Sequence, residues 1–342
     1  MSNLYLGLQQ GLARLRRRNG AWAAEMTLDK GPIASIAVDP LKPELVYACA
    51  MRNGLWRSED SGATWRQVGA GITRPIVTVV EVSRTERVGG EGAVYVGTRL
   101  SALFRSEDGG RSFRELPTFL EIESRPRWSF PPEPDTHHVR SLLADPHQAG
   151  LVLAGIELGG VVRSTDGGAT WEDQKPNADL DPHTLIGHPA APGRMYIGGG
   201  AGYSESFDGG ATWRRFHEGL EHCYCFDLVV DPGDPGTMVI SAANDPFTGH
   251  GVPGFERTWS TLYRRDKDGR WAGITDGLPE RDGTAMGLLA VSADEPGAFS
   301  YVTVPGELYR SNDQGVHWER IPVEWPAATE RRLVQDAIGA PG

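Results

Sequence analysis

The segment Arg57–Val68 reads RSEDSGATWRQV, and its core is Ser58-x-Asp60-x-Gly62-x-Thr64-Trp65. The same pattern returns at residues 106–113, 164–171, 206–213 and 311–318, and a degraded copy lies at residues 266–271. An aspartate at this position accepts hydrogen bonds from backbone N–H groups of its own turn, and the glycine allows a positive φ. Each copy therefore predicts a tight turn that closes a β-hairpin, with the aromatic ring packed beneath it.

The units around these turns predict a repeated antiparallel sheet. Each unit reads as three strands, the turn and a short fourth strand, and successive turn aromatics lie 42 to 58 residues apart. A four-stranded propeller blade spans about 40–50 residues, so the two longest units carry insertions. Helical periodicity is nearly absent, and 44 glycines and 24 prolines indicate a chain rich in turns.

The turn motif resembles the Asp-box, or bacterial neuraminidase repeat (BNR). Proteins that carry it include sialidases, sortilin-type receptors, two-domain xyloglucanases, a photosystem-assembly factor and many uncharacterised bacterial proteins known as BNR-like or glycosyl-hydrolase-like. The resemblance covers nearly the whole chain and implies an all-β propeller. It implies no activity, because the motif closes a hairpin and does no chemistry, so function must be argued from the site.

We predict a seven-bladed β-propeller of four-stranded antiparallel blades, forming one domain over residues 1–342. First strands are expected to begin near residues 33, 77, 139, 183, 225 and 286. Segments 4–8, 11–16 and 22–26 would form a seventh blade whose first strand comes from residues 332–338. Closing the ring with strands from both termini removes an exposed sheet edge. Six blades with an N-terminal appendage is the alternative.

Composition narrows the possible partners. The formal net charge is −11, which argues against nucleic acid or an anionic membrane surface as the main partner. Three cysteines without a framework spacing indicate a reducing compartment. The N-terminus lacks the pattern of a signal peptide, and no apolar stretch approaches the roughly 18 residues that span a bilayer. We therefore expect a soluble, cytoplasmic protein.

Strand order predicts where a site would lie. The turn motifs belong on one face of the ring, and the second-to-third-strand loops and blade connections belong on the other, called here the top face. The insertions at residues 117–136, 244–260 and 322–331 are all expected on top, where long loops carry function. Their rings would either wall a pocket or merely pin their own loops: Trp128, Phe130, Phe247, Phe255, Trp259 and Trp325.

Polar side chains are concentrated where strands of blades three to five meet the top face. We expect four of them to be catalytic: His138, Glu157, His183 and Tyr203. Nine more are expected to bind substrate: Arg52, Arg99, Arg140, His137, His222, Tyr224, Asn244, Trp128 and Trp259. A glutamate and histidines could exchange protons with a substrate, and arginines hold anionic groups. In the alternative interpretation, the histidines hydrogen-bond between blades and the tyrosines pack there.

A metal is a further option for the same residues. Either His137 or His138, which point to opposite sides of a strand, could combine with Glu157 and His183 as two imidazoles and one carboxylate. We favour His138 for this set. The cofactor stays open, with a divalent metal as one choice.

The resemblance does not supply the reaction. Sialidases use an early Arg-Ile-Pro element that this chain lacks, and the arginines here cannot be matched to their triad. Xyloglucanases of this type need two propellers, and sortilin-type receptors need an exported, disulfide-bonded neighbour. We therefore expect a hydrolase or lyase that acts on a small molecule in the central funnel of the top face. The alternative is a non-catalytic scaffold that binds a protein partner with the same face.

Overall fold

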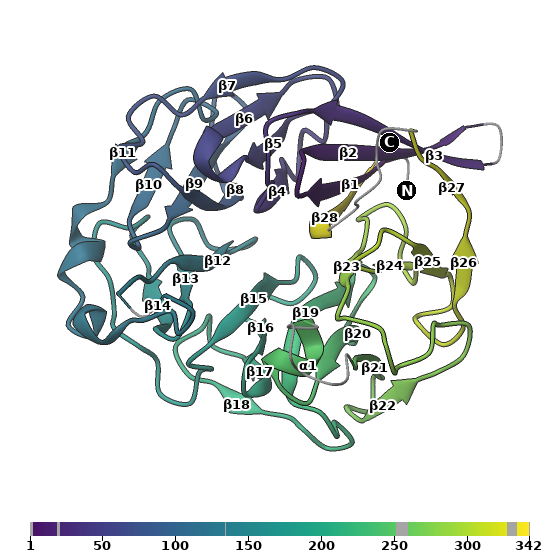
Figure 1. The fold of residues 1–342 in the computed structure, drawn as a ribbon. Helices are drawn as coiled ribbons and strands as arrows, with labels where there is room; N and C mark the ends of the chain where they lie inside the picture. Colours follow the sequence, from purple (N-terminus) through teal and green to yellow (C-terminus); the bar gives the residue numbers. More distant parts are fainter. Residues whose placement is uncertain (1–2, 19–20, 134, 251–258, 327–333, 342) are drawn as a thin grey trace.

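The computed structural model describes residues 3–18, 21–133, 135–250, 259–326 and 334–341. Seven antiparallel sheets form a ring, as Figure 1 shows, and the centre of the ring, surrounded by the innermost strands, is here called the channel. The predicted seven-bladed propeller is confirmed. First strands begin within two residues of the predicted positions. No helix in the described ranges is both long and apolar enough to cross a bilayer.

The strands of blades one to six follow one another along the chain, from the channel outward. Blade one has β4 (Ser35–Val38), β5 (Val46–Cys49), β6 (Leu55–Ser58) and β7 (Arg66–Val68). Blade two has β8 (Val77–Val88), β9 (Glu91–Thr98), β10 (Leu103–Ser106) and β11 (Arg114–Glu115). Blade three has β12 (Val139–Ala144), β13 (Val152–Ile156) and β14 (Gly160–Ser164), with a single bridge between Arg163 and Glu172 in place of a fourth strand.

The next three blades keep the same order. Blade four has β15 (Pro182–Gly187), β16 (Met195–Gly199), β17 (Gly202–Ser206) and β18 (Arg214–Arg215). Blade five has β19 (Tyr224–Asp231), β20 (Asp234–Ala243), β21 (Thr261–Arg265) and β22 (Trp271–Ile274). Blade six has β23 (Leu288–Ala290), β24 (Phe299–Val302), β25 (Leu308–Ser311) and β26 (Glu319–Ile321).

The seventh blade combines the two ends of the chain. Its strands are β28 (Val334–Ala340), β1 (Asn3–Leu8), β2 (Leu12–Arg18) and β3 (Ala21–Leu28). β28 lies innermost and pairs antiparallel with β1, from Asn3 opposite Ala340 to Leu8 opposite Val334. Outside β3, the short β27 (Val323–Glu324) adds a parallel strand. Part of the insertion expected on the top face, residues 323–324, therefore extends this sheet at its outer edge.

The hydrophobic core lies between adjacent blades. One cluster combines β9 and β13 side chains such as Tyr95 and Ala154, and six comparable clusters follow around the ring. The insertion before blade three belongs to this core. It contains the short helices η2 (Pro117–Glu121) and η3 (Arg125–Arg127), and its Phe119 and Trp128 pack against each other, with ring centroids 5.6 Å apart.

The repeated turns have the predicted local geometry. In the first, one carboxylate oxygen of Asp60 accepts the N–H groups of Ala63 and Thr64 at 3.0 and 2.8 Å, and the other accepts the Thr64 hydroxyl at 2.6 Å. The Ser58 hydroxyl donates to Asp60 at 2.7 Å and accepts the Gly62 N–H at 2.8 Å. Gly62 has a φ of 75°. All these bonds lie within seven residues, and Tyr5 and Arg14 of the neighbouring blade add bonds to the Ser61 carbonyl at 2.9 and 2.8 Å.

Replacing Asp60 by asparagine is expected to lower the free energy of unfolding by about 1 kcal/mol at neutral pH, since an exposed carboxylate is partly screened by water. Burial acts to raise the pKa of Asp60, but hydrogen bonds from Thr64, Ser58 and Ala63 lower it to about 2. Stability from this group is present above the unfolded pKa of roughly 4 and disappears as the pH falls towards 2. Denaturant titrations at several pH values should show the difference vanishing in acid. Asp29→Asn, an exposed change outside the turn, is the control, and a pH-independent difference would contradict the argument.

Candidate active site at the top of the channel

Polar side chains gather where β12, β13 and β15 meet the top face. His138 and Arg140 are two residues apart at the start of β12, so they share one side of the strand. Asp181 and His183 have the same relation at the start of β15. Glu157 directly follows β13, and its N–H donates to the His138 carbonyl at 3.2 Å. Two neighbouring blades thus present five ionisable groups to one region.

The Glu157 carboxylate lies between two basic side chains of its own blade. Its Oε2 is 3.6 Å from His138 Nε2 and 3.7 Å from Arg140 Nε. Both contacts are longer than ordinary hydrogen bonds, and the Glu157 side chain is 16% exposed. Burial raises the pKa of Glu157, although the Arg140 charge opposes this. The group is therefore disposed to hold a proton.

Asp181 and His183 form a tighter pair in blade four. His183 Nε2 is 3.2 Å from Asp181 Oδ2, and Nδ1 is 2.7 Å from the Cys225 carbonyl of β19. Both ring nitrogens face acceptors, which favours the doubly protonated imidazolium. Burial acts to lower the pKa of His183, but the hydrogen bond and charge of Asp181 outweigh it and raise the pKa. His183 in turn holds the pKa of Asp181 below its usual value, against the effect of burial.

Arg140 reaches from this cluster into the channel. Its guanidinium lies 5.8 Å from the Phe226 ring centroid, and with His138, Met51 and Thr78 it lines a cavity of about 290 Å³. Burial, followed by the charges of Arg140 and Arg99, lowers the pKa of His138 to about 4, so this imidazole is neutral near pH 7. The Arg140 guanidinium and the neutral His138 imidazole therefore line the cavity. Glu157 lies next to both of them but is not itself a lining residue.

Three further carboxyl groups, here called the channel carboxyl groups, lie on the innermost strands β8, β19 and β28. Glu81 accepts the Ala144 N–H at 3.3 Å, Asp227 accepts Leu289 N–H at 2.7 Å, and Asp336 accepts Ile36 N–H at 2.5 Å. Each bond joins one inner strand to the inner strand of the next blade. Burial raises the pKa values of these groups to about 8, 6 and 7, in the same order, and the Arg140 charge opposes the rise for Asp227 and Asp336.

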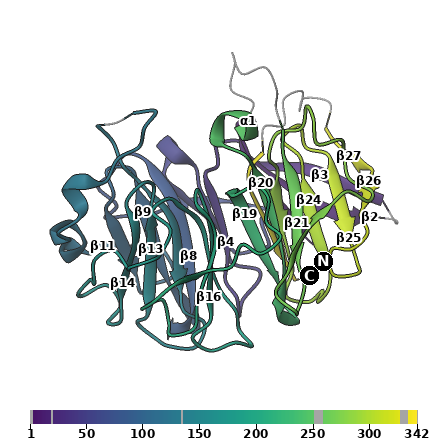
Figure 2. The ribbon, with the colours of Figure 1, turned by 90° about the horizontal axis from the view of Figure 1, so that it is seen from below.

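Other residues expected at the site lie at its edge. The Tyr224 ring meets the His183 ring edge-on at 5.1 Å, and its hydroxyl is 3.4 Å from Nε2 of His250. Figure 2 shows α1 (Pro246–His250), the helix that carries His250, standing above the strands at the rim. Asn244 is exposed just after β20. Arg99 makes an ion pair with Glu133 and reaches the Thr136 hydroxyl at 3.3 Å.

Several expected site residues lie elsewhere. Tyr203 is fully buried in the blade core, with its ring 5.0 Å from Trp271. Trp128 is 5% exposed and packs in the core between blades two and three, where its ring meets His137 at 5.8 Å. His222 and Trp259 pair with each other, at 4.2 Å, beside a separate cavity of blade five. Arg52 is exposed on the short helix η1 (Met51–Asn53). Phe255 lies outside the described residues.

The donor atoms that suit a divalent cation differ from the expected set. One atom each from Glu157, Asp181 and His183 lie within 4.8 Å of one another, and His138 is not among them. Two carboxylates and one imidazole are donors that Zn²⁺ and Mn²⁺ accept. The Nδ1–H of His183 is held by a carbonyl, and the Asp181 Oδ1 atom is buried without a hydrogen-bond partner. The residues are therefore compatible with a divalent cation.

Sequence reasoning missed Asp181, Phe226, His250 and the channel carboxyl groups. Asp181 had a usable signal, because it precedes His183 by two residues on a strand and must share its face. The channel carboxyl groups had none, since single acidic residues inside apolar strands do not reveal which neighbour they bond.

Comparison with known proteins supports the fold alone. No protein-family model and no curated protein sequence matches the chain. Among solved structures, an ancestral GH74 enzyme has a TM-score of 0.63 and 17% identity over 92% of this chain and 40% of its own. The GH74 xyloglucanase from Xanthomonas campestris has a TM-score of 0.61 and 21% identity, over 85% and 45%. YCF48 bound to D1 peptide has a TM-score of 0.56 and 17% identity, over 84% and 80%. The chain thus spans less than half the length of these two GH74 enzymes.

Proposed function

We propose that the protein is a small-molecule enzyme of hydrolase or lyase type, with its site at the top of the channel. The observation that carries this is the proximity of two carboxyl groups, with oxygen atoms within 4.8 Å of each other, whose environments shift their pKa values in opposite directions. Glu157 is disposed to hold a proton and Asp181 to release one. Two neighbouring groups whose pKa values are shifted in opposite directions are the usual arrangement for acid–base catalysis.

The proposed roles follow from these states. In a hydrolysis, Asp181 takes a proton from the attacking water while Glu157 gives its proton to the leaving group. The pair therefore gains one proton and loses one, and its total charge does not change. In an elimination, Asp181 takes the proton from carbon instead. His183 positions Asp181 and keeps it ionised, Arg140 holds an anionic group of the substrate, and Tyr224 lies where its hydroxyl can donate to a substrate oxygen.

The carboxyl spacing bears on the substrate class. Inverting glycosidases need their two carboxyl groups about 6.5–9.5 Å apart to admit a water molecule. Oxygen atoms of Glu157 and Asp181 lie within 4.8 Å. The proposed enzyme therefore does not use that arrangement, although its fold is similar to GH74 enzymes. The repeated turns support placing it among the Asp-box proteins of bacterial BNR-like type.

Glu157→Gln and Asp181→Asn are each expected to reduce kcat at least 100-fold, a typical contribution of one acid–base group. Substrates would be sought first by thermal-shift screening of small acids, phosphate and carboxylate esters and sugars, with and without Zn²⁺, Mn²⁺ or Mg²⁺. Glu133→Gln, which removes the exposed partner of Arg99, is the matched control and should retain full activity. Turnover that is unchanged in both Glu157→Gln and Asp181→Asn, or a ligand that binds both variants as tightly as the wild type, would contradict the proposal.

A binding or assembly scaffold is the second candidate. It is favoured by Phe247, which is 49% exposed on α1 at the top rim, and by the same fold in YCF48, a structure that contains a bound peptide. If the protein is a scaffold, Glu157→Gln and Asp181→Asn should bind the partner as tightly as the wild type does. Loss of partner binding in Phe247→Ser, with Glu157→Gln unaffected, would favour the scaffold over the enzyme.

A further inference from the structure

A separate cavity lies between blades five and six. It has a volume of about 420 Å³ and is bounded by β21, the end of β22 and the connection that follows β22, with Tyr301 of β24 at one side. Ligand pockets typically measure about 300–1,000 Å³. The predicted site did not include this cavity, and only Trp259 among its lining residues was expected to bind a ligand.

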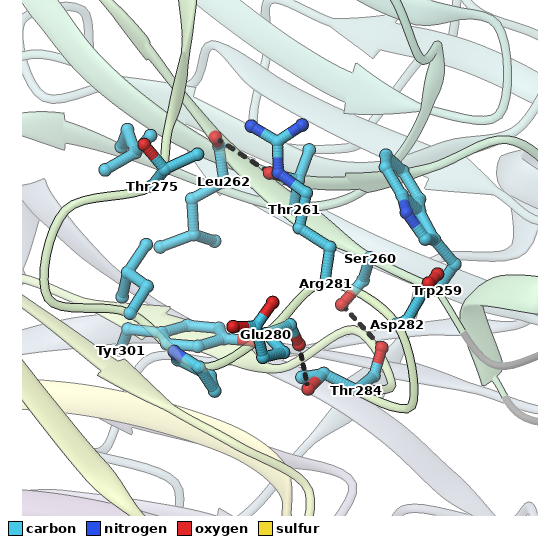
Figure 3. A pocket seen from close by; sticks show the side chains of 13 residues that line it. Trp259, Ser260, Thr261, Leu262, Thr275, Glu280, Arg281, Asp282, Thr284 and Tyr301 are labelled. Carbon is cyan, nitrogen blue, oxygen red and sulfur yellow. Dashed lines mark hydrogen bonds between the residues drawn. The ribbon is translucent and has the colours of Figure 1, made fainter.

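The Arg281 guanidinium lies in this cavity and has no hydrogen-bond or ion-pair partner among the described residues. Figure 3 shows the Arg281 side chain extending from its loop towards Thr261 on β21, with Trp259 on one side and Tyr301 on the other. The guanidinium also lies against Gly273 of β22, where an added Cβ would be 3.1 Å from Nη2. No described residue accepts a hydrogen bond or ion pair from the Arg281 side chain, and its Nε atom is buried. A half-buried guanidinium without an acceptor costs free energy that an anionic ligand would recover.

The rest of the lining indicates what kind of molecule carries that anion. Leu262, Ile274 and Leu278 provide apolar surface, and Trp259 provides an aromatic ring. Two hydroxyl groups of the lining already have hydrogen-bond acceptors. The Ser260 hydroxyl donates to the Thr284 carbonyl at 2.9 Å, and the Thr284 hydroxyl donates to the Glu280 carbonyl at 2.6 Å. The acidic side chains of Glu280 and Asp282 also line the cavity, and their negative charges disfavour a ligand that carries more than one negative charge.

We propose that this cavity is a second ligand site, which takes a small aromatic or cyclic monocarboxylic acid. The carboxylate pairs with both ends of the Arg281 guanidinium fork, and the flat apolar body lies against Trp259 and Leu278. The site is independent of the activity proposed for the funnel, because it shares no lining residue with the cavity at His138 and Arg140.

Benzoate is the first probe, with benzamide as its neutral counterpart, measured by calorimetry and ligand-observed NMR on the full chain. A ligand of this size binds in the high micromolar to millimolar range at best. Benzoate is expected to bind at least about tenfold more tightly than benzamide, because only benzoate pairs with Arg281. Arg281→Gln should remove that preference, and Arg281→Lys should keep part of it.

Two further variants separate this site from the funnel and from misfolding. Arg140→Gln should leave benzoate binding unchanged; if it removes binding while Arg281→Gln does not, the proposal is wrong. Benzoate should also quench indole fluorescence, and Trp259→Phe should remove the quench without a change in thermal midpoint. Equal affinity for benzoate and benzamide, no binding at millimolar concentration, or a quench that persists in Trp259→Phe would each overturn the proposal.

Discussion

Replacing Glu205 by alanine is expected to lower the free energy of unfolding by about 3–5 kcal/mol, the usual cost of leaving buried charges without their partner. Glu205 is fully buried on β17 and accepts from two arginines, Arg194 of its own blade and Arg265 of blade five. The Arg265 guanidinium also lies over the rings of Tyr203 and Phe216, at 5.3 and 5.2 Å. Truncation would strand two guanidinium groups inside the interface between two blades.

Chemical denaturation at neutral pH measures this effect. Glu205→Gln keeps the shape of the side chain and should cost less than alanine, since the amide oxygen can still accept one hydrogen bond. The control is Glu107→Ala, because Glu107 is an exposed partner of Arg105 and such pairs contribute about 1 kcal/mol or less. A Glu205→Ala protein within about 1 kcal/mol of the wild type would show that the arginines find other acceptors.

Replacing Arg140 by methionine is expected to destabilise the protein by an amount that grows with pH, reaching about 2 kcal/mol near pH 8. Its guanidinium opposes the raised pKa values of Glu157, Asp227 and Asp336. A carboxyl group whose pKa is higher in the folded than in the unfolded state contributes stability below its unfolded pKa. That stability is lost as the pH rises through the pKa of the folded state. Without Arg140 these folded pKa values rise further, so the loss extends to higher pH.

The thermal midpoint of both proteins between about pH 5 and pH 9 tests this expectation. The other charged and titratable groups that face Arg140 are His138, Asp181, His183, Tyr224 and His250. Arg99→Met is the control, because Arg99 has an exposed partner in Glu133 and should show little pH dependence. A deficit that is equal at all pH values would mean that Arg140 acts by packing on Phe226 instead.

The fold could be predicted because its signal is local. The bonds of the first repeated turn run between Ser58 and Thr64, and the copies mark the ends of the third strands almost without reference to the rest of the chain. Strand counting then placed the inner strands and the chain termini. Non-local pairing was needed only for β28, where the requirement to remove a sheet edge gave the answer.

The candidate site was less predictable because it depends on side-chain direction. His138, Arg140, Glu157 and His183 were expected at the strand ends and do lie together there, but their roles remain a proposal. Tyr203 was misplaced because a residue at the start of a third strand can face the neighbouring sheet as readily as the funnel. Trp128 turned into the core because its indole N–H donates to the Ser124 hydroxyl and its ring packs on Phe119. Sequence spacing alone does not encode either preference.

The pairing of β28 with β1 has a consequence for the time course of synthesis. β1, β2 and β3 are complete once residue 28 has been made, but their inner partner ends at residue 340. At about 5–20 residues per second, the first sheet waits roughly 15–60 seconds for its last strand. Ring closure therefore cannot precede the synthesis of β28, and until then the inner edge of β1 is open to wrong partners. We expect a chaperone that shields unpaired strands to matter most in that interval.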